Sequence, residues 1–255
     1  VKEKNLKVKG WPFDASAIKE MLKDEKATRK EVELAPGVKM TFVRIPAGEF
    51  VMGSYRGSKD AYPTTKVKIS KPFWMGEMEV TNQQYNVIFP DHDSRFVDQQ
   101  WKDHVIQGYP ANKPEQPVIR VSYNDVVEYC QKLSEKTGLN ITLPTEAQWE
   151  WACRAGSSTP FWFGDLNADY SRYANLGDIR LKEFATCSSY KQYESVRIIE
   201  NPNKYDDWIP RDTLYNDGGF ISEQVGRYIC NPWDLFDMHG NVWEWTRSVY
   251  RPYPY

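Results

Sequence analysis

The sequence lacks the long apolar run that a membrane-spanning helix needs. Mean hydropathy is −0.69 over 255 residues, and no uninterrupted apolar stretch approaches the roughly 20 residues of a span. A surplus of one charge is also missing: Lys and Arg number 33, Asp and Glu number 35, and the net charge is −2. We therefore expect no membrane span and no basic footprint for binding nucleic acid.

Histidine is scarce, and no two cysteines lie close together. His92, His104 and His239 are far apart, and none lies four residues from another, which disfavours a histidine-based metal site. The four cysteines contain no CxxC pair, which excludes a zinc knuckle or a thioredoxin-type motif. Two disulfides and buried free thiols are both compatible with this pattern.

Aromatic and chain-breaking residues are abundant instead. Phe, Tyr and Trp make up 15% of the chain, with 10 Trp, and there are 15 Gly and 16 Pro. This composition indicates a loop-rich domain whose few regular elements are pinned by large rings. Residues 157–236 show little periodicity, and so long an irregular stretch is expected only where something ties it down.

The first of four predicted helices lies in an appendage over residues 1–38. Asp14 is expected to cap a helix over residues 15–30. Ile18, Met21 and Leu22 fall on one side of it, as in an amphipathic helix. We interpret it as a linker helix that docks on the main body.

Capping signals mark three further helices. Thr81 is expected to cap residues 82–89, and Ser122 to cap residues 123–136. Thr145 begins the last helix, in a capping box with the glutamine three residues later. Glycines at the ends of the last two helices are typical termination signals.

Strands are predicted before and between these helices. Two lie over residues 40–54, joined at residues 46–48, and another lies over residues 71–81. The C-terminal DMHGNVWEWTRS is expected to form a turn and a short aromatic strand. Five tryptophans could either stack on sugars or fill the core, and we expect the core. They are Trp149, Trp151, Trp162, Trp243 and Trp245.

Five strings now stand in order: FVRIPAGEFVMGS, MGEMEVTNQQY, PVIRVSYNDVVEYC, LPTEAQWEWACRAG and GNVWEW. Together they resemble the sulfatase-modifying-factor family, whose founding member is the formylglycine-generating enzyme. The resemblance spans about residues 39–245 and implies an α+β fold related to C-type lectins, with little regular secondary structure. It implies a domain over residues 39–255. Because the family contains oxidases and binding proteins, it does not by itself settle function.

The family oxidase binds copper through two cysteines after an Arg-Gly-Gly-Ser stretch, and soft thiolates suit Cu(I). No such stretch or pair is present here, so the domain is interpreted as C-terminally incomplete, with no catalytic residue in this chain. Truncation, completion by another chain and a degenerate module with free thiols are the alternatives. Cys130 and Cys153 match structural cysteines of the animal enzyme, whereas Cys187 and Cys230 have no clear counterpart and are expected to pair with each other.

The resemblance also implies two structural calcium sites. One set comprises the side chains of Asp237 and Glu244 and the carbonyls of Gly240 and Val242. The second set comprises Asn175, the carbonyl of Leu176, Asp217 and a carbonyl near Gly219. These hard oxygen donors suit Ca²⁺.

The resulting hypothesis is a calcium-stabilised, non-catalytic binding or assembly module with a protein or peptide partner, a larger assembly or a glycan. One alternative is a copper-dependent oxidase that converts a sulfatase cysteine to formylglycine, if a further C-terminal segment supplies the cysteine pair. A carbohydrate-binding module of a secreted protein is the other. Calcium sites and paired cysteines favour an extracytoplasmic location, periplasmic or secreted.

Overall fold

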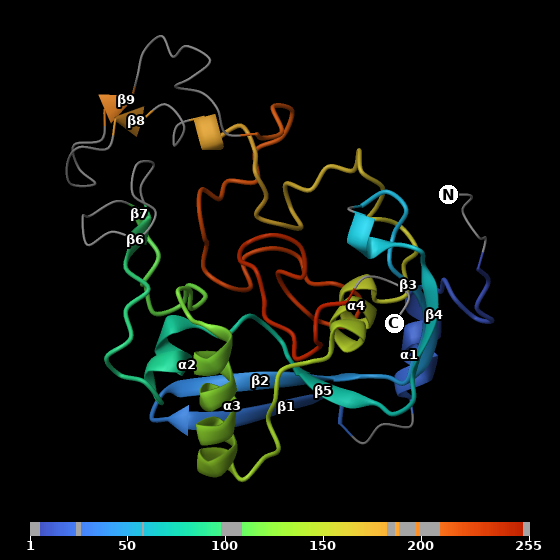
Figure 1. The fold of residues 1–255 in the computed structure, drawn as a ribbon, viewed down its shortest axis with the longest axis horizontal. Coiled ribbons are helices and arrows are strands. Elements are labelled where there is room, and N and C mark those ends of the chain that lie inside the picture. The colour runs from blue at the N-terminus through green and yellow to red at the C-terminus, as the bar shows by residue number, and fades with distance from the viewer. Residues whose placement is uncertain are drawn as a thin grey trace.

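A three-stranded antiparallel sheet lies along one side of the molecule (Figure 1). Its order is β1 (Arg29–Ala35), β2 (Val38–Ile45) and β5 (Phe73–Gly76). After β2 the chain turns at residues 46–47 into β3 (Gly48–Met52), which pairs with β4 (Thr65–Ile69) in a separate sheet. The computed structural model describes residues 6–23, 27–57, 59–97, 109–182, 187–188, 197–198 and 210–251.

Four helices accompany these sheets, and their N-caps are those that the sequence predicts, whereas the C-cap of the last is Ala155 rather than Gly156. They are α1 (Ala15–Leu22), α2 (Asn82–Asn86), α3 (Tyr123–Thr137) and α4 (Glu146–Arg154). Capping boxes begin α2 at Thr81, α3 at Ser122 and α4 at Thr145. Such reciprocal hydrogen bonds satisfy backbone amides that have no partner inside the helix.

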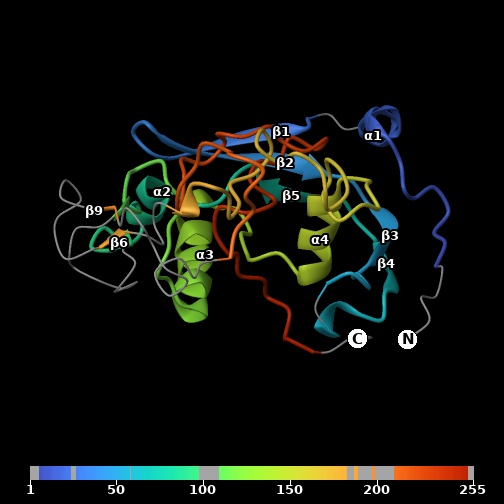
Figure 2. The same ribbon diagram turned by 90° about the horizontal axis from the view of Figure 1, so that it is seen from above.

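Short elements complete the described chain. They are the 3₁₀ helix η1 (Lys59–Ala61), the pair β6 (Phe96–Val97) and β7 (Tyr109–Pro110), and the pair β8 (Cys187–Ser188) and β9 (Arg197–Ile198). From residue 210 onward the described segment forms no helix or strand. It runs through the middle of the molecule, between α3 and α4, in both views (Figures 1 and 2). This α+β, loop-rich architecture confirms the expected fold class.

The main core lies between α4 and the strands. Trp151 is fully buried there, and its indole N–H donates to the carbonyl of Pro46 at 2.9 Å. A Cβ on Gly48 would lie 2.6 Å from the Trp151 ring, so glycine is needed where the ring meets the strand. Ile18 of α1 is buried in the same cluster, which confirms that this helix docks on the main body.

Several predicted elements differ in the structure. The strand predicted over residues 71–81 is limited to Phe73–Gly76, and the helix predicted over residues 82–89 ends at Asn86. The first helix ends at Leu22 rather than at residue 30. Strand β1 (Arg29–Ala35) lies in the predicted appendage, and its first two residues were predicted to belong to that helix. Only Leu34 of that edge strand is fully buried, and its alternation is confined to residues 31–34, where Val32 is half-buried and both glutamates are exposed. The expected aromatic strand around residues 242–246 is an irregular segment.

The tryptophans also divide differently from the prediction. Trp151 belongs to the core, while Trp149 and Trp162 are only partly buried. Trp243 is fully exposed and Trp245 is 48% exposed, so the core interpretation is wrong for these two residues. They lie on a loop without strand pairing, where no alternating pattern turns their rings inward.

The described cysteines are free thiols. Cys153 is buried, and Cys130 and Cys230 are partly buried, which agrees with the free-thiol alternative for these three residues. Cys230 therefore forms no bridge in this structure, and the side chain of Cys187, its expected partner, lies outside the described residues. No helix in the described part of the chain is long and apolar enough to cross a membrane.

Candidate metal centre

The loop over residues 237–244, which carries the first predicted calcium ligands, has an unusual backbone path. Asp237 and Asn241 each have a φ of 54°, and Gly240 has a φ of 89°. Asp and Asn are among the non-glycine residues that tolerate this left-handed region best. A Cβ at Gly240 would collide with the carbonyl oxygen of Asn175, so this position requires glycine because two backbone segments approach closely.

The structure brings the two predicted ligand sets together at Asn175. The Asn241 amide N–H donates to the Asn175 carbonyl at 2.9 Å, and the Asn175 side-chain amide donates to Asn241 Oδ1 at 3.1 Å. A cavity of about 550 Å³ opens beside this contact. Asn175, Asp237 and Glu244 are among its lining residues.

Asp237 is a buried carboxylate with one unused oxygen. The residue is 4% exposed, and Oδ2 accepts the Gly226 amide at 2.7 Å. Oδ1 is buried without a hydrogen-bond partner among the described residues. Burial raises the pKa of the Asp237 carboxyl above its ordinary value, since the charged form loses its hydration.

Glu244 is the second carboxylate of this loop. Its Oε1 accepts the indole N–H of Trp149 at 3.1 Å. The residue as a whole is exposed, but desolvation of its carboxyl raises the pKa of Glu244 to about 7. The Trp149 hydrogen bond opposes this rise, and the charge of Asp237 adds to it. Glu244 therefore lies in an environment that disfavours an unaccompanied negative charge.

Glu79 is a third carboxylate at this place, and sequence reasoning assigned it no role. It follows β5, is 7% exposed, and accepts the Asn241 side-chain amide at 2.7 Å and the Val242 N–H at 3.3 Å. Burial, followed by the charges of Glu244 and Asp237, raises the pKa of Glu79 well above its ordinary value. The two acids Glu77 and Glu79 within the otherwise apolar string WMGEMEV were the available signal, because buried acids are rarely left unpaired.

All three carboxyl groups have raised pKa values because their charged forms are desolvated. Within the described residues, Glu79, Asp237 and Glu244 form no ion pair, and no basic side chain lowers their pKa values. Neighbouring negative charges removed from water repel each other strongly. Either protonation or a bound cation can relieve this repulsion.

The second predicted set is also gathered in space, but its carboxylate is already occupied. Asp217 is 7% exposed; Oδ2 accepts the Leu176 amide at 2.8 Å, and Oδ1 accepts the Gly219 amide at 2.6 Å. The Tyr228 hydroxyl donates to Oδ1 at 3.3 Å. The backbone amides of Leu176 and Gly219, rather than their carbonyls, therefore point at Asp217 and use its oxygens within the loop.

The first set fits calcium better than the second. Its donor chemistry is carboxylate and carbonyl oxygen, which hard Ca²⁺ prefers, and the buried Asp237 Oδ1 is unsatisfied. No three side chains of His, Cys, Asp or Glu converge as a metal group among the described residues. A cation here would thus depend on the carbonyls of Gly240 and Val242 in addition to Asp237 and Glu244.

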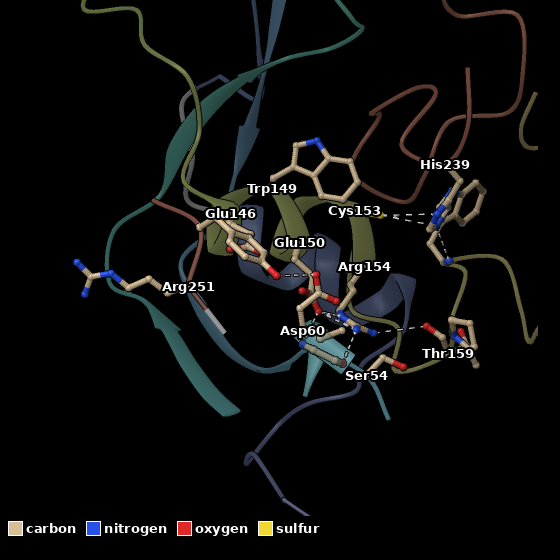
Figure 3. Close-up of a pocket in the computed structure, with 15 residues that line it drawn as sticks. Ser54, Asp60, Glu146, Trp149, Glu150, Cys153, Arg154, Thr159, His239 and Arg251 are labelled. Atoms are coloured by element: carbon tan, nitrogen blue, oxygen red, sulfur yellow. Dashed lines mark hydrogen bonds and ion pairs between the residues drawn. The ribbon is translucent and has the colours of Figure 1, made fainter. Parts of the chain in front are cut away.

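A second pocket, of about 350 Å³, lies on another side of Trp149 (Figure 3). In it Arg154 pairs with Glu150 at 2.7 Å and also donates to the carbonyl of Gly53 at 3.0 Å. The Gly53 amide donates to Glu150 Oε1 at 2.8 Å. The acid in this pocket is therefore compensated by groups of the protein itself.

Cys153 and His239 face each other at the edge of the second pocket (Figure 3). Sγ lies 3.6 Å from Nε2, which accepts the Trp162 amide at 3.3 Å. Burial raises the pKa of the Cys153 thiol, and burial, helped by the Arg154 charge, lowers the pKa of His239 to about 4. At neutral pH both groups are uncharged, so the pair does not present the activated thiolate of a cysteine nucleophile.

Fold and site together define a loop-rich α+β domain whose C-terminal loop is held by buried acids. The chain belongs to the family described as the sulfatase-modifying factor enzyme 1-like domain, whose model matches residues 28–255. This membership confirms the resemblance recognised from the five sequence strings.

Relatives carry different names. The formylglycine-generating enzyme of Mycobacterium tuberculosis is 29% identical over 146 residues, covering 56% of this chain and 37% of that protein. The mouse formylglycine-generating enzyme is 25% identical, covering 80% and 57% respectively. The mouse inactive C-alpha-formylglycine-generating enzyme 2 is also 25% identical, covering 82% and 69%. The chain thus covers 37% and 57% of the lengths of the two relatives named formylglycine-generating enzyme.

The fold also matches solved structures. PvdO from Pseudomonas aeruginosa superposes with a TM-score of 0.61 at 25% identity, covering 89% of this chain and 77% of that one. Treponema denticola variable protein 1 shares the fold with a TM-score of 0.58 at 19% identity, covering 87% and 77%. Proteins with differing names therefore share this architecture, and the site must decide the function.

Proposed function

We propose that this domain is a calcium-stabilised binding or assembly module, non-catalytic by itself. The supporting observation is the group of three desolvated carboxylates, Glu79, Asp237 and Glu244, with no basic partner in the described chain. A Ca²⁺ ion held by Asp237, Glu244 and carbonyls of the same loop would offset their repulsion. It would also order a loop that has no regular secondary structure of its own.

The proposed partner is a protein or peptide that docks beside the 237–244 loop. Trp243 is fully exposed, and Trp245, Val249 and Tyr250 are 48%, 71% and 75% exposed. A run of large exposed side chains is typical of an interaction surface. Because extracellular modules bind calcium at concentrations available outside the cytosol, the proposed location is extracytoplasmic.

The test is calcium binding by the purified protein. Elemental analysis should find calcium, EDTA should lower the melting temperature, and titration of the stripped protein with Ca²⁺ should restore it. Asp237→Ala should abolish the restoration, while Asp165→Ala, at an exposed acid, should leave it intact. Absence of calcium, together with a melting temperature that EDTA does not move, would overturn the proposal.

The names of the relatives favour a second candidate, generation of formylglycine. This activity would need a copper-binding cysteine pair from outside the described residues, because Cys130, Cys153 and Cys230 are separate free thiols. Incubating the protein with copper, oxygen and a Cys-x-Pro-x-Arg peptide tests it. An aldehyde product detected by mass spectrometry would replace the non-catalytic assignment.

A further inference from the structure

The Asn241 side chain lies at a junction of several chain segments. Its Oδ1 accepts from Asn175 Nδ2 at 3.1 Å and from the Glu223 amide at 2.8 Å. Its Nδ2 donates to Glu79 Oε2 at 2.7 Å and to the Glu223 carbonyl at 3.3 Å. All four hydrogen-bonding positions of the amide are thus used, which fixes both its place and its orientation.

These contacts also orient the backbone of the 237–244 loop. In a trans peptide the carbonyl points opposite to the amide N–H of the next residue. The Asn241 N–H is held by the Asn175 carbonyl at 2.9 Å, so the Gly240 carbonyl, a predicted ligand, is directed away from Asn175. The Val242 N–H is held in turn by Glu79 Oε1 at 3.3 Å.

The conformation that is held in this way is one that the chain rarely adopts unaided. Asn241 has a φ of 54° and Asp237, four residues earlier, has the same φ. Left-handed non-glycine residues persist where surrounding contacts over-determine them. Here the contacts come from Glu79 and Asn175, which belong to parts of the chain distant in sequence.

We propose that Glu79 and Asn241 form a positioning pair that presets the 237–244 loop for its cation and couples it to Asn175 in the second predicted ligand set. Neither residue is among the predicted ligands; each acts through the loop backbone. The proposal rests on the calcium binding proposed above. Outer residues of this kind typically change metal affinity by about 10–100-fold when they are altered.

A swap of donor and acceptor tests the pair. Asn241→Asp removes the donor to Glu79 and opposes two carboxylates, while Glu79→Gln replaces one of the two oxygens that accept from Asn241 and Val242. In the double variant E79Q/N241D the hydrogen bond is restored in reverse, because the amide introduced at position 79 can donate to the carboxylate introduced at position 241. The double variant also keeps the number of carboxylates unchanged.

Calcium affinity measured by titration calorimetry is the first readout. Each single variant should bind Ca²⁺ about tenfold more weakly or worse, and the double variant should recover part of the loss seen in Asn241→Asp, because the donor to the Glu223 carbonyl is not restored. Glu77→Gln is the matched control: Glu77 is a buried acid two residues away, but its partner is Arg29 at 2.6 Å, and the affinity should be unchanged. A double variant no better than the weaker single variant would overturn the proposal.

The second readout separates this proposal from that of calcium binding itself. Melting temperatures of the four proteins in EDTA form a double-mutant cycle, and the two substitutions should be non-additive because the residues are in contact. If the wild type binds no calcium, the proposed function fails. The cycle in EDTA still measures the interaction between residues 79 and 241. Additive effects on melting temperature in EDTA would refute the pairing whatever the calcium result.

Discussion

Two pockets that share Trp149 accommodate their acids in opposite ways. In one, Glu150 is paired with Arg154 and receives the Gly53 amide. In the other, Asp237 and Glu244 line the pocket, Glu79 lies next to it against Asn241 and Val242, and none of the three has a basic partner among the described residues. The first arrangement is complete in the protein alone, whereas the second is complete only with protons or a cation. The difference locates the candidate site on chemical grounds, independently of any relative.

Among changes at the two pockets, breaking the Arg154–Glu150 pair should destabilise the protein most. Arg154→Met leaves Glu150 without its cation, and loss of one partner from a largely buried pair costs about 3 kcal/mol. Denaturant unfolding should show this loss equally with calcium and with EDTA. Arg56→Met is the control, because the Arg56–Asp165 pair is exposed and should contribute less than about 1 kcal/mol. A loss that appears only without calcium would mean that the two pockets are not independent.

At the pocket lined by Asp237, removing a charge should increase the free energy of unfolding rather than decrease it. Asp237→Asn removes a buried charge that lacks a partner, keeps an oxygen for the Gly226 amide, and suits the left-handed backbone. We expect the metal-free variant to be more stable than the wild type by about 1 kcal/mol. Urea unfolding in EDTA measures this. A destabilised metal-free variant would show that the Asp237 charge is compensated after all.

The stability of the metal-free protein should depend on pH through Glu244 in one pocket and through His239 in the other. The pKa of Glu244 is raised to about 7 from its ordinary 4.5, so the folded state holds this proton more tightly than the unfolded state. The resulting stability is fully present below pH 4.5 and is lost as the pH rises through 7. In EDTA, the melting temperature of the wild type should therefore fall over this window relative to that of Glu244→Gln.

His239, at the second pocket, acts in the opposite direction. Its pKa is lowered to about 4 from 6.5, so its contribution is present above pH 6.5 and is lost as the pH falls through 4. The difference between the wild type and Glu244→Gln isolates the carboxyl from this background. Identical pH profiles for the two proteins would exclude a role for Glu244.

The smallest effect on stability is expected at Trp243. The side chain is fully exposed, so Trp243→Ala should change the free energy of unfolding by no more than about 0.5 kcal/mol. Trp151→Ala, at the buried core position, should by comparison lose about 3–5 kcal/mol. Chemical denaturation of both variants measures the two losses in the free energy of unfolding. A large loss at Trp243 would mean that the ring packs in the folded protein.

Local features of the fold were predictable from sequence, and non-local ones were not. The caps at Thr81, Ser122 and Thr145 depend on residues three positions apart, so the sequence shows them directly. Strand β1 escaped prediction because its alternation is limited to residues 31–34 and its first two residues had been assigned to the preceding helix. The orientation of the Trp243 and Trp245 rings depends on tertiary packing rather than on the period of a strand.

The candidate site shows the same division. Asp237 and Glu244 are close in sequence, and a family resemblance was enough to suggest them. Glu79 reaches the same loop from 162 residues before Asn241, a separation that no local pattern encodes. For the second set the prediction placed Asp217 with its correct neighbours, Leu176 and Gly219, but could not show that backbone amides would fill its oxygens.

The contact between Glu79 and Asn241 also has a consequence for synthesis on the ribosome. A chain that grows by about 5–20 residues per second needs roughly 8–32 s to add the intervening 162 residues. During that interval Glu79 lacks the hydrogen bond from Asn241, and this contact must await the synthesis of the 237–244 loop. The acidic pocket is therefore assembled late, after the helices between its two halves have emerged.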